Sequence, residues 1–219
     1  MRLIGPVVAD APTLQTEQRA AVTHPSVGTA CGRREFLRRS AAAGAGLLTF
    51  VIAGREQQLT AAQARAAGVP YSTFTAPQVR SLECLGEALV AGSASLGLAH
   101  FIDRQLSGPA ADSMLMIKYL GVSPPFTDFY TRGLAAADSA ALQQFSQPLT
   151  ALSARDTHAL LAAMAAGAPA AWNGPPAALF FFVLRNDAVD VTYGTPAGFA
   201  QLGVPYMAHI APPAKGWSE

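Results

Sequence analysis

The side chains that most often take part in catalysis are few and scattered along this chain. Asp187 and Asp190 are three residues apart, which places both carboxylates on one side of a helix. No base or metal ligand accompanies them, so solvation at a helix end is favoured over a catalytic pair. None of the histidines has another His, Asp or Cys at the spacing of a metal site. The four histidines are His24, His100, His158 and His209.

Motifs that bind cofactors are also missing from the sequence. There is no phosphate loop, dinucleotide fingerprint or nucleophile elbow, and no cysteine motif for haem or an iron–sulfur cluster. We therefore assign no catalytic, cofactor-binding or metal-binding residue to this chain. Cys31 lies in the leader described below, which leaves Cys84 as a single thiol. Both a buried, inert thiol and a disulfide to another subunit remain open for Cys84.

The overall charge excludes one class of partner and suggests another. The chain has 219 residues and a formal net charge of +1, so it lacks the broad basic surface that nucleic acid requires. Only 13% of its residues are charged, compared with about 25% in an average soluble domain. Such a surface favours coverage by another protein, although an alanine-rich composition explains part of the deficit.

An export signal is indicated near the N-terminus. Arg33 and Arg34 are followed by Phe36 and Leu37, and the stretch 41–53 behind them is uncharged and built from small and apolar residues. A basic head before a short apolar run is typical of a signal, and the arginine pair resembles the twin-arginine type, which a receptor reads as an address. The run is too short to span a bilayer. The alternative is a short buried helix that follows basic residues.

This signal divides the chain and carries a consequence. Ala62-Gln63-Ala64 is a small-x-small cleavage candidate, so we expect a leader with a twin-arginine signal at 1–64 and a helical domain at 65–219. The twin-arginine route is generally understood to carry folded proteins, often because a cofactor is inserted first. Since this chain has no cofactor site, the economical interpretation is that a partner holds the cofactor and this chain holds the address.

The domain is predicted to be all-α, an orthogonal bundle of about six helices. Apolar residues recur at helical spacing between Gly and Pro breakers. The run Leu179–Leu184 has no polar member, so its helix should be central. No alternating run makes a convincing strand. The tail is predicted to be irregular and rich in aromatic residues. The expected helices lie at 75–90, 96–106, 110–120, 127–145, 153–164 and 177–191.

Several strings in this domain match a known pattern. They are Phe101–Leu106, Ala111–Leu120, Pro124-Pro125-Phe126, Asp128-Phe129-Tyr130, Gly133-Leu134, Pro175–Leu184, Thr192-Tyr193-Gly194 and Gly216-Trp217. Together they resemble the gluconate 2-dehydrogenase subunit 3 family, which is the small subunit of membrane-bound flavin dehydrogenases. The similarity covers about residues 75–217.

The resemblance implies a heterotrimer in the periplasm, associated with the cytoplasmic membrane through its partners. A large subunit of the glucose–methanol–choline type would bind FAD and oxidise a sugar, sugar acid or polyol. A multihaem cytochrome c subunit would pass electrons to the quinone pool, and an iron–sulfur centre is a further candidate in the partner subunits. The small subunit would hold no cofactor. It would escort the folded large subunit through the twin-arginine translocase and then stabilise it.

The aromatic residues of the tail are the interface anchors that we expect, because aromatic side chains dominate such contacts. Packing of these side chains on the chain's own helices is an equal alternative. Two rival functions remain from other classes: a stand-alone small exported helical enzyme, and a binding protein tethered to the membrane by an uncleaved signal. The expected anchors are Tyr193, Phe199, Tyr206 and Trp217.

Overall fold

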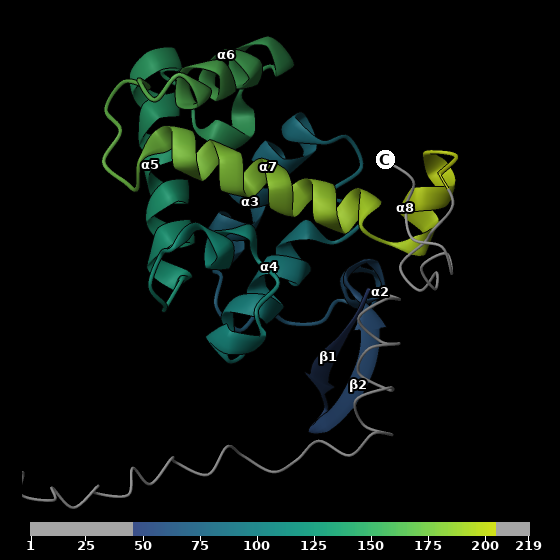
Figure 1. Cartoon of the computed structure of the whole chain (residues 1–219). Coiled ribbons are helices and arrows are strands. Elements are labelled where there is room, and N and C mark those ends of the chain that lie inside the picture. The colour runs from purple at the N-terminus through teal and green to yellow at the C-terminus, as the bar shows by residue number, and fades with distance from the viewer. Residues whose placement is uncertain (1–45, 205–219) are drawn as a thin grey trace, which may run out of the picture.

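The structure is a computed structural model of the whole chain, and it describes residues 46–204. Those residues are mostly helical, with one small antiparallel sheet at their N-terminal end (Figure 1). The elements in chain order are β1 (Leu47–Ile52), β2 (Arg55–Thr60), α2 (Ala61–Ala66), α3 (Ala76–Leu89), α4 (Leu98–Leu106), the 3₁₀ turns η1 (Ala110–Asp112) and η2 (Met116–Leu120), α5 (Thr127–Phe145), the 3₁₀ turn η3 (Leu149–Ala151), α6 (Ala154–Ala165), α7 (Ala177–Tyr193) and α8 (Pro196–Gln201).

Helix α7 organises the helical part of the molecule. It crosses the front of the bundle in Figure 1 and contacts α3, α4, α5, α6, α8 and η2. Phe180, Leu184 and Ala188 on its inner side are completely buried. Gly133 of α5 lets the ring of Phe180 approach closely, because a Cβ at position 133 would overlap that ring. The predicted central helix is therefore present, and most helical spans expected from the sequence are confirmed to within about two residues at each end.

The described part of the expected helical domain, residues 65–204, is helical as predicted, but a β-hairpin precedes it in the stretch that was assigned to the leader. Strands β1 and β2 pair antiparallel, with Leu48 opposite Leu59, through a tight turn whose two central residues, Ala53 and Gly54, have φ of 49° and 73°. Leu48 and Phe50 alternate inward and are buried. No strand was predicted here because β2 is mostly polar and the apolar residues of β1 were assigned to the signal.

The helix expected at 110–120 is wrong, because the segment forms the two 3₁₀ turns η1 and η2 instead. Side chains of neighbouring helices accept hydrogen bonds from two backbone N–H groups of this segment. The Gln105 side chain of α4 accepts a hydrogen bond from the N–H of Met114 at 3.0 Å, and the Asp187 side chain of α7 accepts one from the N–H of Met116 at 3.0 Å. These bonds favour an extended backbone over a continuous helix.

The tail that was expected to be irregular begins with helix α8. Thr195 caps this helix, since its hydroxyl accepts a hydrogen bond from the N–H of Gly198 at 3.1 Å, and Pro196 occupies the first turn. Helix α8 lies against the C-terminal end of α7. The tail after residue 204 lies outside the described part of the chain.

Candidate partner-binding surface

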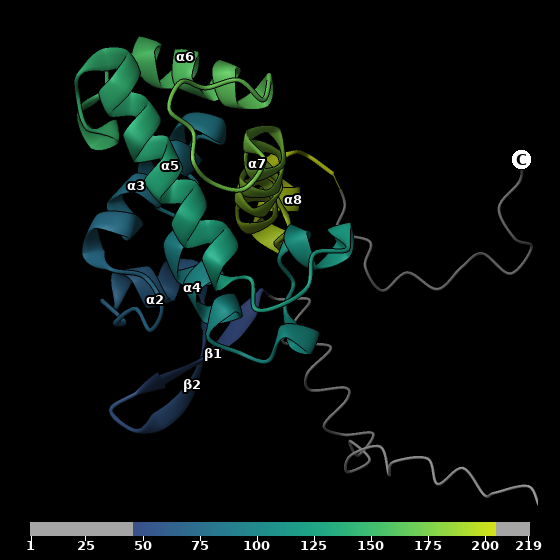
Figure 2. The same ribbon diagram turned by 90° about the vertical axis from the view of Figure 1, so that its left-hand side faces the viewer.

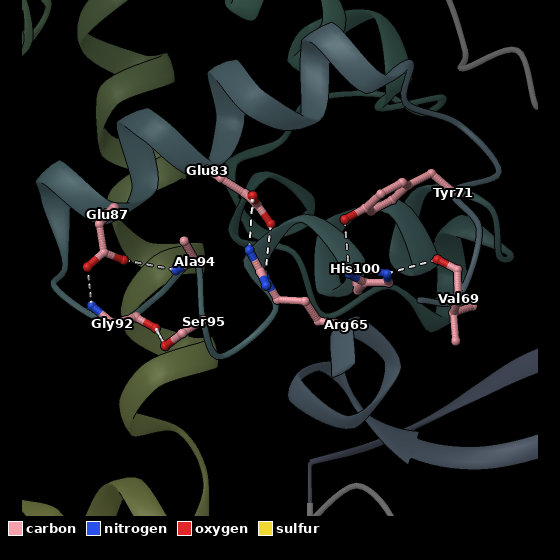
Figure 3. Close-up of polar contacts among 9 residues, drawn as sticks. All are labelled: Arg65, Val69, Tyr71, Glu83, Glu87, Gly92, Ala94, Ser95 and His100. Carbon is pink, nitrogen blue, oxygen red and sulfur yellow. Dashed lines mark hydrogen bonds and ion pairs between the residues drawn. The ribbon is translucent and has the colours of Figure 1, made fainter. Parts of the chain in front are cut away.

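A polar cluster joins α2, α3 and α4, and it contains His100 (Figure 3). Nε2 of His100 lies 2.9 Å from the carbonyl oxygen of Val69, and Nδ1 lies 3.1 Å from the hydroxyl of Tyr71. Because a carbonyl only accepts hydrogen bonds, Nε2 carries the proton and Nδ1 accepts from Tyr71. Burial lowers the pKa of His100, which keeps the ring neutral. Both ring nitrogens are occupied in holding the segment before α3, so the geometry assigns His100 a structural role.

Asp103, one turn further along α4, fixes the same segment by a second set of contacts. Its carboxylate accepts hydrogen bonds from three successive backbone N–H groups, those of Ser72 at 2.8 Å, Thr73 at 2.8 Å and Phe74 at 2.9 Å. The residue itself is buried. A buried carboxylate is costly unless it is fully hydrogen-bonded, and these N–H groups supply the partners.

Two acidic side chains of α3 complete the cluster in Figure 3. Glu83 forms a two-pronged ion pair with Arg65, at 3.2 and 3.3 Å. Glu87 accepts hydrogen bonds from the N–H groups of Gly92 at 2.8 Å and Ala94 at 3.2 Å in the loop after α3. Each of these contacts satisfies groups of the chain itself, so the cluster connects elements and presents no free reactive group.

The carboxylate pair considered from the sequence separates into two different environments. Asp187 is completely buried, which contradicts solvation at a helix end. Its Oδ2 accepts a hydrogen bond from the hydroxyl of Tyr130 at 2.6 Å. Burial raises the pKa of Asp187 to about 7, although the bonds from Tyr130 and Met116 act in the opposite direction. Asp190 remains exposed at the surface, and partial burial raises its pKa as well.

Residues 46–204 contain no group of three or more His, Cys, Asp and Glu side chains that could hold a metal ion. A shallow pocket of about 280 Å³ lies between the end of α4 and the Pro124-Pro125 turn. Its polar side chain is Gln105, whose amide oxygen already binds the N–H of Met114. Within the same residues, none of the helices has the length and apolar character needed to cross a membrane.

The thiol of Cys84 is half-buried and forms no disulfide. Its Sγ lies 3.7 Å from the carbonyl oxygen of Leu149, and burial raises its pKa. A thiol with a raised pKa is a poor nucleophile, so this environment favours the inert role over a reactive one.

The outward side of α7 is the feature that stands out on the surface. Phe182 is 43% exposed and Val189 is 36% exposed, and the polar side chains of Arg185 and Asn186 lie between them on the same side of the helix. These two residues are seven apart and therefore lie on one stripe of the helix, which continues to Tyr193. We call Phe182, Val189 and Tyr193 the α7 face. In Figure 1, α7 runs across the front of the helical bundle.

Helix α7 and the segment beneath it carry further apolar side chains at the surface. Figure 2 views α7 nearly end-on, with the 110–120 segment just below it on the same side of the molecule. The 3₁₀ turn η2 contacts α7 and exposes Tyr119 at 66% and Leu120 at 38%. Exposed apolar side chains on adjoining elements favour a surface that another protein covers.

Comparison with known protein families gives one match, to the profile of gluconate 2-dehydrogenase subunit 3 over residues 82–210. The match spans more than half of the chain. The chain belongs to the gluconate 2-dehydrogenase subunit 3 family. No curated protein and no solved structure matches it. The matched region contains the α7 face, Asp103 and Asp187, whereas the β-hairpin and α2 precede it. The family is that of a dehydrogenase subunit, which is consistent with a chain that is not itself catalytic.

Two of the four aromatic residues expected as interface anchors lie within the described residues. Tyr193, the last residue of α7, is partly buried and packs against the hydrophobic core, while also ending the α7 face. Phe199 lies in α8 and is partly buried. Tyr206 and Trp217 lie outside the described residues. So do all four residues of the export motif, which are Arg33, Arg34, Phe36 and Leu37.

Sequence reasoning missed Phe182 and Val189. Both belong to a helix that was predicted to be central, and a helix with no polar side was expected to be buried throughout. The spacing of seven residues between them was visible in the sequence. Which stripe of an apolar helix stays uncovered depends on how its neighbours pack, and that information is not local.

Proposed function

We propose that this chain is the non-catalytic small subunit of a periplasmic, membrane-associated dehydrogenase complex that oxidises a sugar, sugar acid or polyol. The observation that carries the proposal is the family match over residues 82–210, since the family is that of a dehydrogenase subunit. In the complex, a large subunit of the glucose–methanol–choline type binds FAD and carries out the oxidation. A multihaem cytochrome c subunit takes the electrons onward to the membrane.

The work of the small subunit in this proposal is export and stabilisation. Arg33 and Arg34, with Phe36 and Leu37 behind them, direct the assembled pair to the twin-arginine translocase. The chain binds the folded large subunit before export and stays bound afterwards. The low charge of the chain, 13% of residues, and the uncovered α7 face support a lasting contact with a larger protein.

The contact surface that we propose for the large subunit is the α7 face. It combines Phe182, Val189 and the aromatic ring of Tyr193 along one helix. Aromatic side chains are over-represented among residues that dominate binding energy. Phe199, Tyr206 and Trp217 further along the chain remain proposed anchors of the same interface.

The test is to co-express this chain with the FAD-binding and cytochrome subunits of the proposed complex, and to follow the large subunit in the periplasm. Conversion of both Arg33 and Arg34 to Lys should abolish periplasmic large subunit and its dye-linked dehydrogenase activity, while both proteins accumulate in the cytoplasm. Conversion of Arg38 and Arg39 to Lys is the matched control and should leave export unchanged. Undiminished export in the Arg33 and Arg34 variant would refute the signal, and activity of the purified chain alone would refute the non-catalytic role.

A further inference from the structure

One stretch of this chain belongs both to the predicted export signal and to the folded domain. The apolar run of the signal is 41–53, and the structure places Leu47–Ile52 of that run in strand β1. The cleavage candidate Ala62-Gln63-Ala64 lies within helix α2, directly after the hairpin. Removal of everything up to residue 64 would therefore take away both strands and most of α2.

The hairpin is attached to the bundle by apolar and polar contacts. Leu48 and Phe50 are 7% and 6% exposed and belong to the main hydrophobic core. The guanidinium Nε of Arg104 in α4 donates a hydrogen bond to the carbonyl oxygen of Thr49. Strand β1 also contacts α2 and α4 directly. Loss of β1 would expose the apolar surface that Leu48 and Phe50 cover, at a free-energy cost of roughly 25 cal/mol for each Å² exposed.

Helix α2 is fixed by a capping box, by buried alanines and by an ion pair to α3. Thr60 and Gln63 form a reciprocal capping box, with bonds of 3.1 Å and 2.9 Å between each side chain and the other residue's N–H. Ala61 and Ala64 are buried, and Ala64 has no exposed surface. Arg65 anchors the end of the helix to Glu83 of α3, as Figure 3 shows.

Gly97 is the residue that lets α2 lie so close to the bundle. A Cβ at this position would overlap the backbone carbonyl of Ala61, so the two backbones are in direct contact. Gly97 also has a φ of 85°, in the left-handed region that favours glycine. The approach of α2 is therefore built into the loop before α4.

We infer that the folded chain is closed to processing at Ala62-Gln63-Ala64, and that residues 46–66 remain part of the mature protein. Proteolytic cleavage concentrates in exposed, weakly bonded backbone, whereas this motif is helical, capped and buried at Ala64. The inference rests on the proposed function where it concerns export, because a twin-arginine substrate reaches the processing enzyme already folded. Any cleavage of the exported chain then falls before β1.

The first experiment measures the intact mass of the small subunit isolated with its complex from the periplasm. The expected N-terminus lies before residue 47, and an N-terminus at Arg65 would overturn the inference. A second arm uses Ala62→Asp, which places a charge in the small-x-small motif and an acidic group in the first turn of α2, where it is tolerated. This variant should have the same N-terminus as the wild type. Accumulation of precursor or a shifted N-terminus would mean that the motif is used.

The third arm opens the motif deliberately. Gly97→Ala introduces the overlap with Ala61, whereas Gly92→Ala adds a Cβ where nothing lies within 4 Å. Both glycines have nearly the same φ, 85° and 88°, so the backbone strain is matched. A fragment that begins at Arg65 should be found with Gly97→Ala and be absent with Gly92→Ala. Equal processing of the two variants would show that the approach of α2 does not close the motif.

Hydrogen exchange on the purified full-length chain separates failure of this inference from failure of the proposed function. If the chain is never exported, the export proposal fails, but the hairpin can still be measured. Amide protons of β1 and β2 that exchange as slowly as those of α4 would support retention of residues 46–66 in the folded domain. Exchange at the rate of an unfolded segment would overturn it.

Discussion

The hydroxyl of Tyr130 in α5 donates a 2.6 Å hydrogen bond to Oδ2 of Asp187 in α7, and neither side chain has any exposed surface. The other carboxylate oxygen accepts a hydrogen bond from the N–H of Met116, the first residue of η2. One buried acid therefore connects two long helices and the 3₁₀ turn η2 that precedes them in the chain. Such fully bonded polar groups specify how a core is arranged, and partial loss of their partners is costly.

The stability of the chain should fall as the pH rises from about 4 to about 7. Burial raises the pKa of Asp187 from 3.8 to about 7, so in this range the folded state keeps a proton that the unfolded state has released. Folding then takes up a proton, and the free energy of unfolding decreases with pH by at most about 1.4 kcal/mol per pH unit. Urea unfolding at several pH values measures this slope.

Asp187→Asn is the variant that tests the assignment, because an amide has nearly the same shape and does not titrate. Its slope should be flatter than that of the wild type between pH 4 and 7. The remaining slope should be the sum of two opposing effects, because burial raises the pKa values of Asp138 and Asp190 and lowers that of His100. Parallel curves for the two proteins would exclude Asp187 as the source.

Replacement of Asp103 should destabilise the fold without touching any proposed contact surface. Asp103→Ala leaves three backbone N–H groups without their carboxylate partner and should cost about 2–4 kcal/mol. Asp112→Ala, at an exposed acid in η1, is the control and should change stability by less than about 0.5 kcal/mol. Denaturant midpoints of the purified chains compare the two, and equal midpoints would contradict the structural role of Asp103.

The close approach of α5 and α7 at Gly133 gives a prediction that opposes helix propensity. Alanine is the better helix former, yet Gly133→Ala should destabilise the chain by about 1–3 kcal/mol, because the new methyl group overlaps the ring of Phe180. Ser139→Ala, at a surface position of the same helix, should be neutral or slightly stabilising. Thermal unfolding of both variants measures the difference. A higher melting temperature for Gly133→Ala would show that the two helices can separate without cost.

The α7 face should matter for assembly and not for folding. Phe182→Asp places a charge on an outward side chain. The chain should fold normally, but at least tenfold less large subunit should co-purify with it. Leu142→Asp is the matched control, because Leu142 of α5 is 54% exposed and lies outside the α7 face. Recovery of the large subunit by affinity purification is the measurement. Full recovery with Phe182→Asp would show that the interface lies elsewhere on the chain.

The helices were predictable because their signals are local. Pro175-Pro176 precedes one apolar run and the Pro124-Pro125 turn precedes another. Helices α7 and α5 begin at Ala177 and Thr127, as those signals predicted. The expected helix at 110–120 failed for the opposite reason. Backbone N–H groups of this segment donate hydrogen bonds to the side chains of Gln105 and Asp187. Asp187 lies 71 residues away from its partner, Met116.

The hairpin and the buried acids show the same limit in other ways. Residues 47–52 suit either a signal or a strand, and the contacts of this segment with α2 and α4 decide for the strand in the folded chain. Asp103 is an ordinary helical acid in the sequence, and its role depends on N–H groups about 30 residues earlier. Of the proposed contact residues, Tyr193 was found by residue type alone, whereas Phe182 required knowledge of which side of α7 is uncovered.

The exposed stripe on α7 bears on how much of this protein a cell can tolerate. A copy made without a partner would leave Phe182 and Val189 in water, and exposed apolar side chains of this kind favour association between copies. We expect surplus copies to cluster or to be degraded. Synthesis of the two chains in matched amounts, which coding on one transcript would provide, would then keep the exposed stripe of this helix covered.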